Sequence, residues 1–205
     1  MLASHRGYDA GALVMAQELA QRLDVPLVGS TVSRLLVDLN RSLGHPKVYS
    51  SNIQSAPVEI RASIVGQYYQ PYRTEVETRV RRGIELGCRV VHVSCHSFTP
   101  QLDGLVRNCD VGLLYDPARH GEVGLSKAWQ EAIQTASPHC KVRRNYPYAG
   151  KNDGLTTTLR RRHSAEEYVG IELELNQKLV VKPARRWENL RVMLIESLLR
   201  ALEAG

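Results

Sequence analysis

Apolar residues recur at helical spacing along several stretches of this 205-residue chain. In the stretch 9–23 they form one continuous stripe, which predicts an amphipathic helix with Asp9 at its N-cap. A longer helical pattern covers 57–86, and Pro71 predicts an interruption near Gln70 because proline breaks the helical hydrogen-bond ladder. The same spacing predicts three further helices, over 123–136, 155–162 and 185–202.

Short apolar runs lie between these helices and predict strands. The run 89–95 is rich in valine and is typical of a central strand, whereas 142–144, which ends in arginines, suits a sheet edge. Strands that alternate with helices favour an α/β sandwich with a largely parallel or mixed sheet, and 205 residues suit a single domain. The predicted strands are 25–32, 35–40, 89–95, 111–115, 142–144 and 168–175.

Polar side chains interrupt the strand predicted at 89–95. His92, Ser94 and His96 share one face because side chains alternate along a strand. Ligands bind at the carboxyl ends of the strands in open α/β sheets, and His96 stands at that end. Its neutral imidazole can bind a metal, although a single histidine at such a position is more often a hydrogen-bonded core residue.

A second polar group closes the strand predicted at 35–40. Asp38 and Asn40 share a face of that strand, and Arg41 follows at its tip. An Asn-Arg pair is well matched to a carboxylate ligand, because the guanidinium binds two oxygens in a fork and the amide adds a donor. The alternative is an ion pair between Arg41 and Asp38 at the surface, which contributes little to stability.

Two carboxylates alternate along the strand predicted at 168–175. Glu172 and Glu174 point to one face and the leucines between and after them to the other. One alternative is a solvated strand face. The other is a general base beside a metal-bound water, because partial burial on a rigid strand raises the pKa of a carboxyl toward neutrality.

Composition and charge narrow the classes of partner. The net charge is +6, but the basic residues are scattered and are not interleaved with aromatic residues, so a nucleic-acid groove is not favoured, whereas a small anionic substrate suits a few converging arginines. The sequence has no apolar run of membrane-spanning length, no apolar signal segment and no CxxC pair among its four cysteines. We therefore predict a cytoplasmic protein with neither a membrane nor a nucleic-acid partner.

Several segments, taken in order, resemble those of one family. They are 4–12, 33–34 followed by 38–41, 96–97, 145–150 and 172–174. Over residues 4–177 the chain resembles the N-formylglutamate amidohydrolases, which are similar in turn to the zinc carboxypeptidases and to the aspartoacylase and succinylglutamate desuccinylase group. The resemblance implies a zinc-carboxypeptidase-like, three-layer α/β/α sandwich with a mixed, largely parallel sheet. It also implies zinc-dependent hydrolysis of an N-formyl or N-acyl amino acid, such as N-formylglutamate, to the amino acid and formate.

The resemblance also implies roles for individual residues. His96 would be a zinc ligand, and Asp9 would be either a second ligand or a group that supports one. Glu174, in preference to Glu172, would be the catalytic base that activates the zinc-bound water. The substrate would be a small anionic N-acyl amino acid. The residues expected to bind it are Asn40, Arg41, Arg34, Ser97, Arg107, Asn145 and Tyr148.

One departure from the family pattern concerns the metal. Family members carry an earlier strand and a histidine loop of the Glu-His-Gly-Gly type upstream of the segment that matches Ser4. We expect a single amidohydrolase-like domain over residues 1–205 that lacks this strand and the first metal-binding loop. The alternative function is therefore a non-catalytic, metal-deficient member of the family that binds a small carboxylate ligand.

Overall fold

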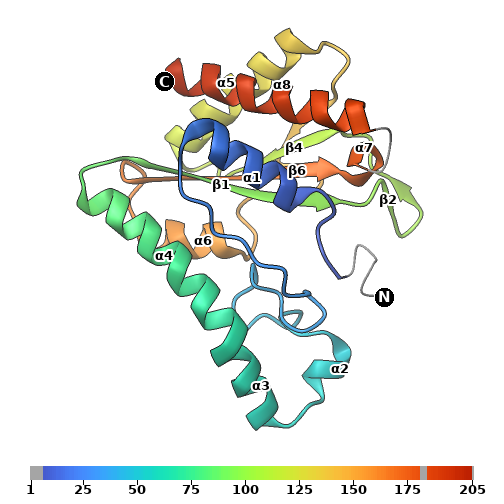
Figure 1. The fold of residues 1–205 in the computed structure, drawn as a ribbon, viewed down its shortest axis with the longest axis vertical. Helices are drawn as coiled ribbons and strands as arrows, with labels where there is room; N and C mark the ends of the chain where they lie inside the picture. The colour runs from blue at the N-terminus through green and yellow to red at the C-terminus, as the bar shows by residue number, and fades with distance from the viewer. Residues whose placement is uncertain (1–6, 181–183, 205) are drawn as a thin grey trace.

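A mixed four-stranded sheet organises the fold (Figure 1). The computed structural model describes residues 7–180 and 184–204, so Ser4 to Arg6 of the first matching segment lie outside the described residues. The strands stand in the order β1 (Val90–Phe98), β6 (Tyr168–Asn176), β4 (Val111–Leu114) and β5 (Val142–Arg144). β1 is parallel to β6 and β5 is parallel to β4, whereas β4 and β6 are antiparallel. The predicted mixed and mostly parallel α/β sheet is confirmed.

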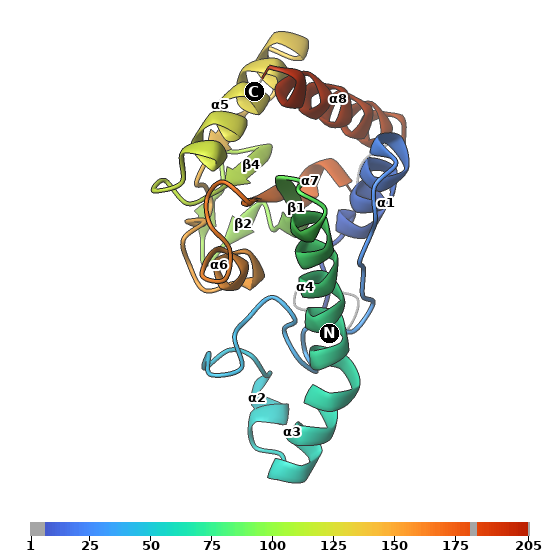
Figure 2. The same cartoon turned by 90° about the vertical axis from the view of Figure 1, so that its left-hand side faces the viewer.

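Helices cover both faces of this sheet (Figures 1 and 2). Helices α1 (Ala12–Leu23), α5 (His120–Ala136) and α8 (Ala184–Glu203) pack on one face over the odd-numbered side chains of β6, where Ile171, Leu173 and Leu175 are fully buried. Helices α4 (Gln70–Glu85) and α6 (Leu155–Arg160) cover the other face, which carries Glu172 and Glu174. The alternation of apolar and acidic residues along β6 therefore separates a dry core from a polar layer.

The remaining elements are short. A ribbon of β2 (Gln101–Leu102) and β3 (Leu105–Val106) follows β1, and α7 (Gln177–Val180) follows β6. None of the described helices is both long and apolar enough to cross a membrane.

Residues 32–69 form a separate small lobe beside the sheet (Figure 2). It contains α2 (Ser51–Gln54), α3 (Val58–Ile64) and a π-helical turn, η1 (Val65–Tyr69), that runs directly into α4. The interruption predicted near Gln70 takes the form of this π-turn, in which the Gln70 N–H donates to the carbonyl of Val65, five residues back. Pro71 lies directly after Gln70, in the first turn of α4 as the chain leaves the π-turn.

The two strands predicted at 25–32 and 35–40 are absent, and this part of the prediction was wrong. Residues 25–32 run as irregular chain, and residues 38–41 form a turn in which the Asn40 N–H donates to the side chain of Asp38. From Val32 onward the apolar residues of this stretch pack into the small lobe, where Val37 is fully buried, whereas Val28 packs against the cluster around Tyr168, and Val25 and Leu27 are exposed. Periodicity alone could not distinguish these two destinations.

Two further predictions need correction. Asp9 does not cap α1: the N-cap is Gly11, with φ 79°, and the Asp9 carboxylate bonds to other side chains. β1 is an edge strand and not a central one, because β6 occupies one side of it and no strand within residues 7–180 and 184–204 occupies the other. Which strand is central depends on pairing between distant segments, which a local pattern does not report.

Candidate active site

The register between β1 and β6 brings the predicted histidine and carboxylates together. His96 stands opposite Glu174, and Ser94 opposite Glu172, near the carboxyl ends of the two parallel strands. All four side chains share one face, as their spacing predicted. His92 lies further from this end, where its Nδ1 is 2.8 Å from the Tyr168 hydroxyl and burial, with the charges of His96 and Arg160, lowers its pKa to about 4.

A chain of polar contacts runs through His96. Its Nδ1 lies 3.0 Å from Asp9 Oδ2, and its Nε2 lies 3.0 Å from Ser94 Oγ. Arg34 binds the same Asp9 oxygen at 2.6 Å. The structure thus places Asp9 and Arg34, which are both remote from the sheet in sequence, against the end of β1.

These contacts shift the pKa values of the groups in the chain. Burial alone would lower the pKa of His96, but the hydrogen bond and charge of Asp9, with the charges of Glu174 and Glu172, outweigh it and raise that pKa to about 9. Burial would raise the pKa of Asp9, but the bond to His96 and the charges of His96 and Arg34 hold it below its usual value. At neutral pH the structure favours an imidazolium that donates to Asp9 and to Ser94.

Glu174 is the carboxylate that other groups leave free. Its side chain is 6% exposed, and its Oε2 is buried without a hydrogen-bond partner among the described residues. The pKa of Glu174 is raised to about 7, chiefly by burial: the charge of His96 lowers it, those of Asp9 and Glu172 raise it, and that of Arg34 lowers it. Glu172, by contrast, accepts a short hydrogen bond from the buried Thr156 hydroxyl.

The turn at 38–41 meets the amino end of α6. Asn40 Oδ1 accepts from the Leu155 N–H at 2.7 Å, and Arg41 Nη1 donates to the carbonyl of Asp153 at 3.0 Å. A Cβ built on Gly154 would lie 3.3 Å from Asn40 Oδ1 and 3.4 Å from Glu172 Oε1, so the turn at 38–41 and β6 both lie against this position. The predicted carboxylate-binding pair therefore lies beside the polar face of β6.

Four other residues predicted to bind substrate already contact neighbouring groups of the protein. Arg107 lies over the rings of Tyr148 and Phe98, 5.0 and 5.8 Å from their centroids, at the carboxyl end of β1. Ser97 points to the opposite face of β1 from His96 and accepts from Gln177 at 3.1 Å. Asn145 uses its side-chain oxygen to accept from two backbone N–H groups, which shapes the loop before α6. A substrate role for these four residues stays a prediction.

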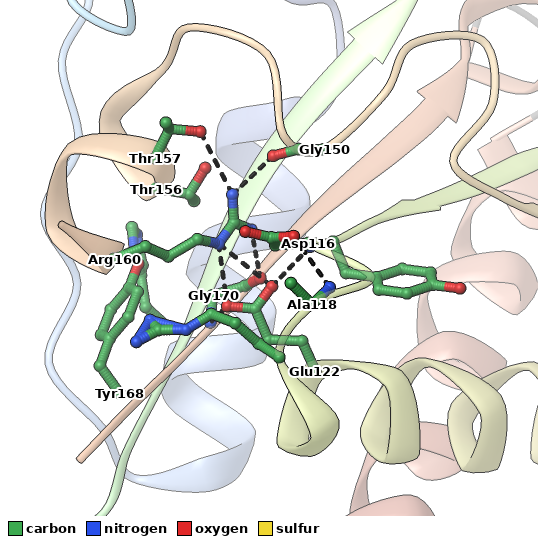
Figure 3. A network of polar contacts seen from close by, with 12 residues as sticks. Asp116, Ala118, Glu122, Gly150, Thr156, Thr157, Arg160, Tyr168 and Gly170 are labelled. Atoms are coloured by element: carbon green, nitrogen blue, oxygen red, sulfur yellow. Dashed lines mark hydrogen bonds and ion pairs between the residues drawn. The ribbon is translucent and has the colours of Figure 1, made fainter. Parts of the chain in front are cut away.

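A buried ion pair that the sequence did not predict lies behind the site (Figure 3). Arg160 Nε donates to both carboxylate oxygens of Glu122, at 2.9 and 3.1 Å, and both side chains are almost fully buried. Glu122 also accepts from the Gly170 N–H, while Arg160 donates to the Gly170 carbonyl.

The ion pair takes the place of a strand. Along β6 the Asn176 N–H donates toward the β4 side, to Asp110, and Gly170 faces that same side by the period of two. β4 has ended at Leu114 before it reaches Gly170, so the carboxylate and the guanidinium satisfy the backbone groups that the neighbouring strand would have paired. Glu122 lies at helical spacing from Ser126, Trp129 and Ile133, the other buried residues of α5, and that position was the one signal in the sequence.

The donor set for a metal is incomplete in the part of the chain that the structure describes. His96 and Asp9 meet each other, but no group of three histidine, cysteine, aspartate or glutamate residues there could hold a metal ion. Catalytic zinc sites use three protein ligands. The described residues therefore do not by themselves fit a complete zinc site.

Comparisons with known proteins agree with this arrangement. The crystal structure of gene product Atu2144 from Agrobacterium tumefaciens is similar to 99% of this chain, over 81% of its own length, with a TM-score of 0.84 and 28% identity. N-formylglutamate amidohydrolase from Ralstonia eutropha JMP134 shares the fold over 94% of this chain and 81% of its own, with a TM-score of 0.71 and 20% identity. No curated protein matches the sequence. The sequence model described as "FGase: N-formylglutamate amidohydrolase" matches residues 1–181. The chain therefore belongs to the N-formylglutamate amidohydrolase family, a family of hydrolases.

Proposed function

We propose that this protein hydrolyses the linear amide of an N-formyl amino acid, such as N-formylglutamate, to the amino acid and formate. The observation that carries the proposal is the Oε2 of Glu174, which has no hydrogen-bond partner within residues 7–180 and 184–204 and is buried opposite His96 at the carboxyl ends of two parallel strands. Family membership and the likeness of the fold to solved relatives support it. The finer likeness to the zinc carboxypeptidases belongs to the same proposal.

The substrate would be anionic, and the turn at 38–41 is the group suited to its carboxylate. Arg41 has a partly exposed side chain and its closest carboxylate, Asp38, lies 4.0 Å away, so its fork is not saturated by a tight ion pair. The side-chain oxygen of Asn40 accepts from the Leu155 N–H, so the amide nitrogen is the part of this side chain that would donate to a ligand. A planar guanidinium beside an amide donor recognises a carboxylate by geometry as well as charge.

Glu174 would act as the general base. The ionised carboxylate takes a proton from water, the resulting hydroxide adds to the formyl carbon, and Glu174 returns the proton to the amine as the C–N bond breaks. The imidazolium of His96, fixed by Asp9, supplies positive charge beside the developing oxyanion. The proton that Glu174 takes from water thus ends on the product amine.

Zinc stays a prediction drawn from the family. When bound at such a site, zinc polarises a carbonyl and lowers the pKa of a bound water. His96, as a neutral imidazole, and Asp9 are the residues that would contact it, so the imidazolium role of His96 applies to the metal-free site only. These two residues fall short of three ligands in the part of the chain described. Metal analysis of the purified protein, with formate release measured before and after chelation and zinc addition, tests the prediction directly.

The incomplete donor set favours one alternative, a protein that binds a small carboxylate without turning it over. Titration calorimetry with N-formyl-L-glutamate, alongside an assay of formate release, separates the two functions. Binding with formate release supports the hydrolase, and binding without release supports the alternative. If N-formyl-L-glutamate neither binds nor reacts, both are wrong.

The setting of the reaction is also a proposal. All four cysteines, Cys88, Cys95, Cys109 and Cys140, are unpaired thiols. Unpaired thiols are typical of reducing compartments, which supports a cytoplasmic location.

We expect the pH dependence of kcat/KM to be bell-shaped. In the metal-free protein, activity should rise as Glu174 ionises, with a pKa of about 7, and fall as His96 loses its proton, with a pKa of about 9. The charged groups that face this pair are Asp9, Glu172 and Arg34. Initial rates of formate release from about pH 5 to about pH 10 measure the profile. A rate that is flat through neutrality would show that Glu174 is not the base.

A further inference from the structure

We infer that Tyr69 and Arg73 are positioning residues for the carboxylate-binding turn, Asn40–Arg41. The inference rests on the proposed function in one respect, namely that this turn holds the carboxylate of the substrate. Neither residue is expected to touch the reacting atoms. Their role is to fix the direction in which the Asn40 and Arg41 side chains point.

Three successive backbone carbonyls of the turn accept hydrogen bonds from these two side chains. The Tyr69 hydroxyl donates to the carbonyl of Arg41 at 2.8 Å. Arg73 Nη1 lies 3.3 Å from the carbonyls of both Leu39 and Asn40. The turn has no strand partner in the described chain, so these donors replace the ladder that would otherwise hold its backbone.

Arg73 also joins the turn to the helix that Asn40 touches. Its Nη2 donates to Thr158 Oγ1 at 2.8 Å, on α6, and Asn40 Oδ1 accepts from Leu155 at the start of the same helix. Arg73 is only 5% exposed and its guanidinium lies over the Tyr69 ring, 5.4 Å from the centroid. A buried guanidinium whose donors are spent on the turn and α6 is an unusual choice for packing alone.

The π-turn η1 is what lets one helical stretch serve both the small lobe and the turn. Ile64 and Tyr69 are five residues apart, yet both are buried in the same small core with Val37 and Val48. In a regular α-helix, residues five apart would point about 140° away from each other. The wider π-turn brings Tyr69 back to the face of Ile64, and Arg73 follows one turn later on that face. π-turns of this kind often mark functional positions.

Equilibrium binding and kinetics of matched variants test the inference. Tyr69→Phe removes one hydroxyl and keeps the ring, and we expect it to weaken binding of N-formyl-L-glutamate about 3- to 10-fold. Arg73→Met removes three hydrogen bonds, and we expect it to weaken binding about 10- to 100-fold, with partial recovery in Arg73→Lys. The loss should fall on Kd and KM, with kcat changed much less, because Glu174 and His96 are untouched.

Two controls separate positioning from general loss of structure. Arg79 lies on the same helix, and its partner in the described part of the chain is the exposed Glu75; Tyr49 is a half-buried tyrosine of the small lobe. Arg79→Met and Tyr49→Phe should therefore both bind as the wild type does. In an Arg41→Met background, Arg73→Met should cause a smaller further loss than it does in the wild type, because one of the two side chains that it orients is gone.

The outcomes are distinguishable from failure of the proposed function. Wild-type binding or hydrolysis together with unchanged Kd and KM in both Tyr69→Phe and Arg73→Met would overturn the inference and leave the function intact. Equal losses of kcat and affinity that follow thermal stability would show a merely structural role. If Arg73→Met does not fold, Tyr69→Phe still decides the matter. Failure of the wild type to bind overturns the proposed function and this inference with it.

Discussion

Glu174→Gln should reduce formate release from N-formyl-L-glutamate by about 10²- to 10⁴-fold, the usual contribution of a general base. The substitution keeps the shape of the side chain but removes the group that takes the proton from water. Glu172→Gln is the matched control on the same strand face, and its loss should be much smaller because Thr156 already occupies that carboxylate. Equal losses in the two variants, or full activity in Glu174→Gln, would remove Glu174 from the mechanism.

The same variant should be no less stable than the wild type near neutral pH. Glu174 has a pKa of about 7 in the folded protein, above its ordinary value of 4.5, so the folded state prefers the protonated form. Its contribution to stability is therefore complete below pH 4.5 and is lost as the pH rises through 7. Glutamine does not ionise, so the stability of Glu174→Gln relative to the wild type should increase over this interval. Urea unfolding at several pH values measures the difference.

Arg160→Met should lower the free energy of unfolding by about 3–5 kcal/mol, because it leaves the Glu122 carboxylate buried without its charge partner. Glu122→Gln removes the other charge and should also be strongly destabilising. The exposed pair of Arg22 and Glu196 is the control: its N–O distance is a comparable 2.8 Å, but Arg22→Met should cost less than about 1 kcal/mol.

Urea denaturation followed by circular dichroism measures both sets of variants. Arg160 and Glu122 also make hydrogen bonds to the backbone of Gly170. In the double variant Glu122→Gln/Arg160→Met no buried charge is left without a partner, but bonds to the Gly170 backbone are lost, so part of the loss of stability should remain. Equal effects of the buried and exposed substitutions would contradict the view that burial sets the size of the loss.

Amphipathic patterns predicted the helices and strands that pack against the larger core, between the sheet and helices α1, α5 and α8. The apolar stripes of α1, α5 and α8 face one sheet surface, so their local period matched their final environment. The alternation along β6 worked for the same reason and placed Glu172 and Glu174 on one face. The family resemblance, carried by short ordered segments, is confirmed by the match over residues 1–181.

The parts that failed depend on contacts between distant residues. Residues 25–40 contain enough apolar side chains for strands, but Val37 packs with Ile64 and Tyr69 in the small lobe. The register that places His96 beside Glu174 is set by pairing across 78 positions, and the pair of Glu122 and Arg160 joins residues 38 apart. Tyr69 and Arg73 gave no signal because their partners are backbone carbonyls of a turn that the sequence had suggested was a strand.

The small lobe has one consequence for how the protein moves. Its apolar core, around Val37, Val48, Ile64 and Tyr69, is separate from the larger core under β6, so the two bodies can open with different free energies. The turn at Asn40–Arg41 connects the two bodies, since it is hydrogen-bonded to Tyr69 of the small lobe and to α6, which packs on the sheet. A ligand carboxylate held at this turn would restrain both bodies at once. Substrate binding would then also raise the free energy of local unfolding of the lobe, and the protein would be most rigid when its site is filled.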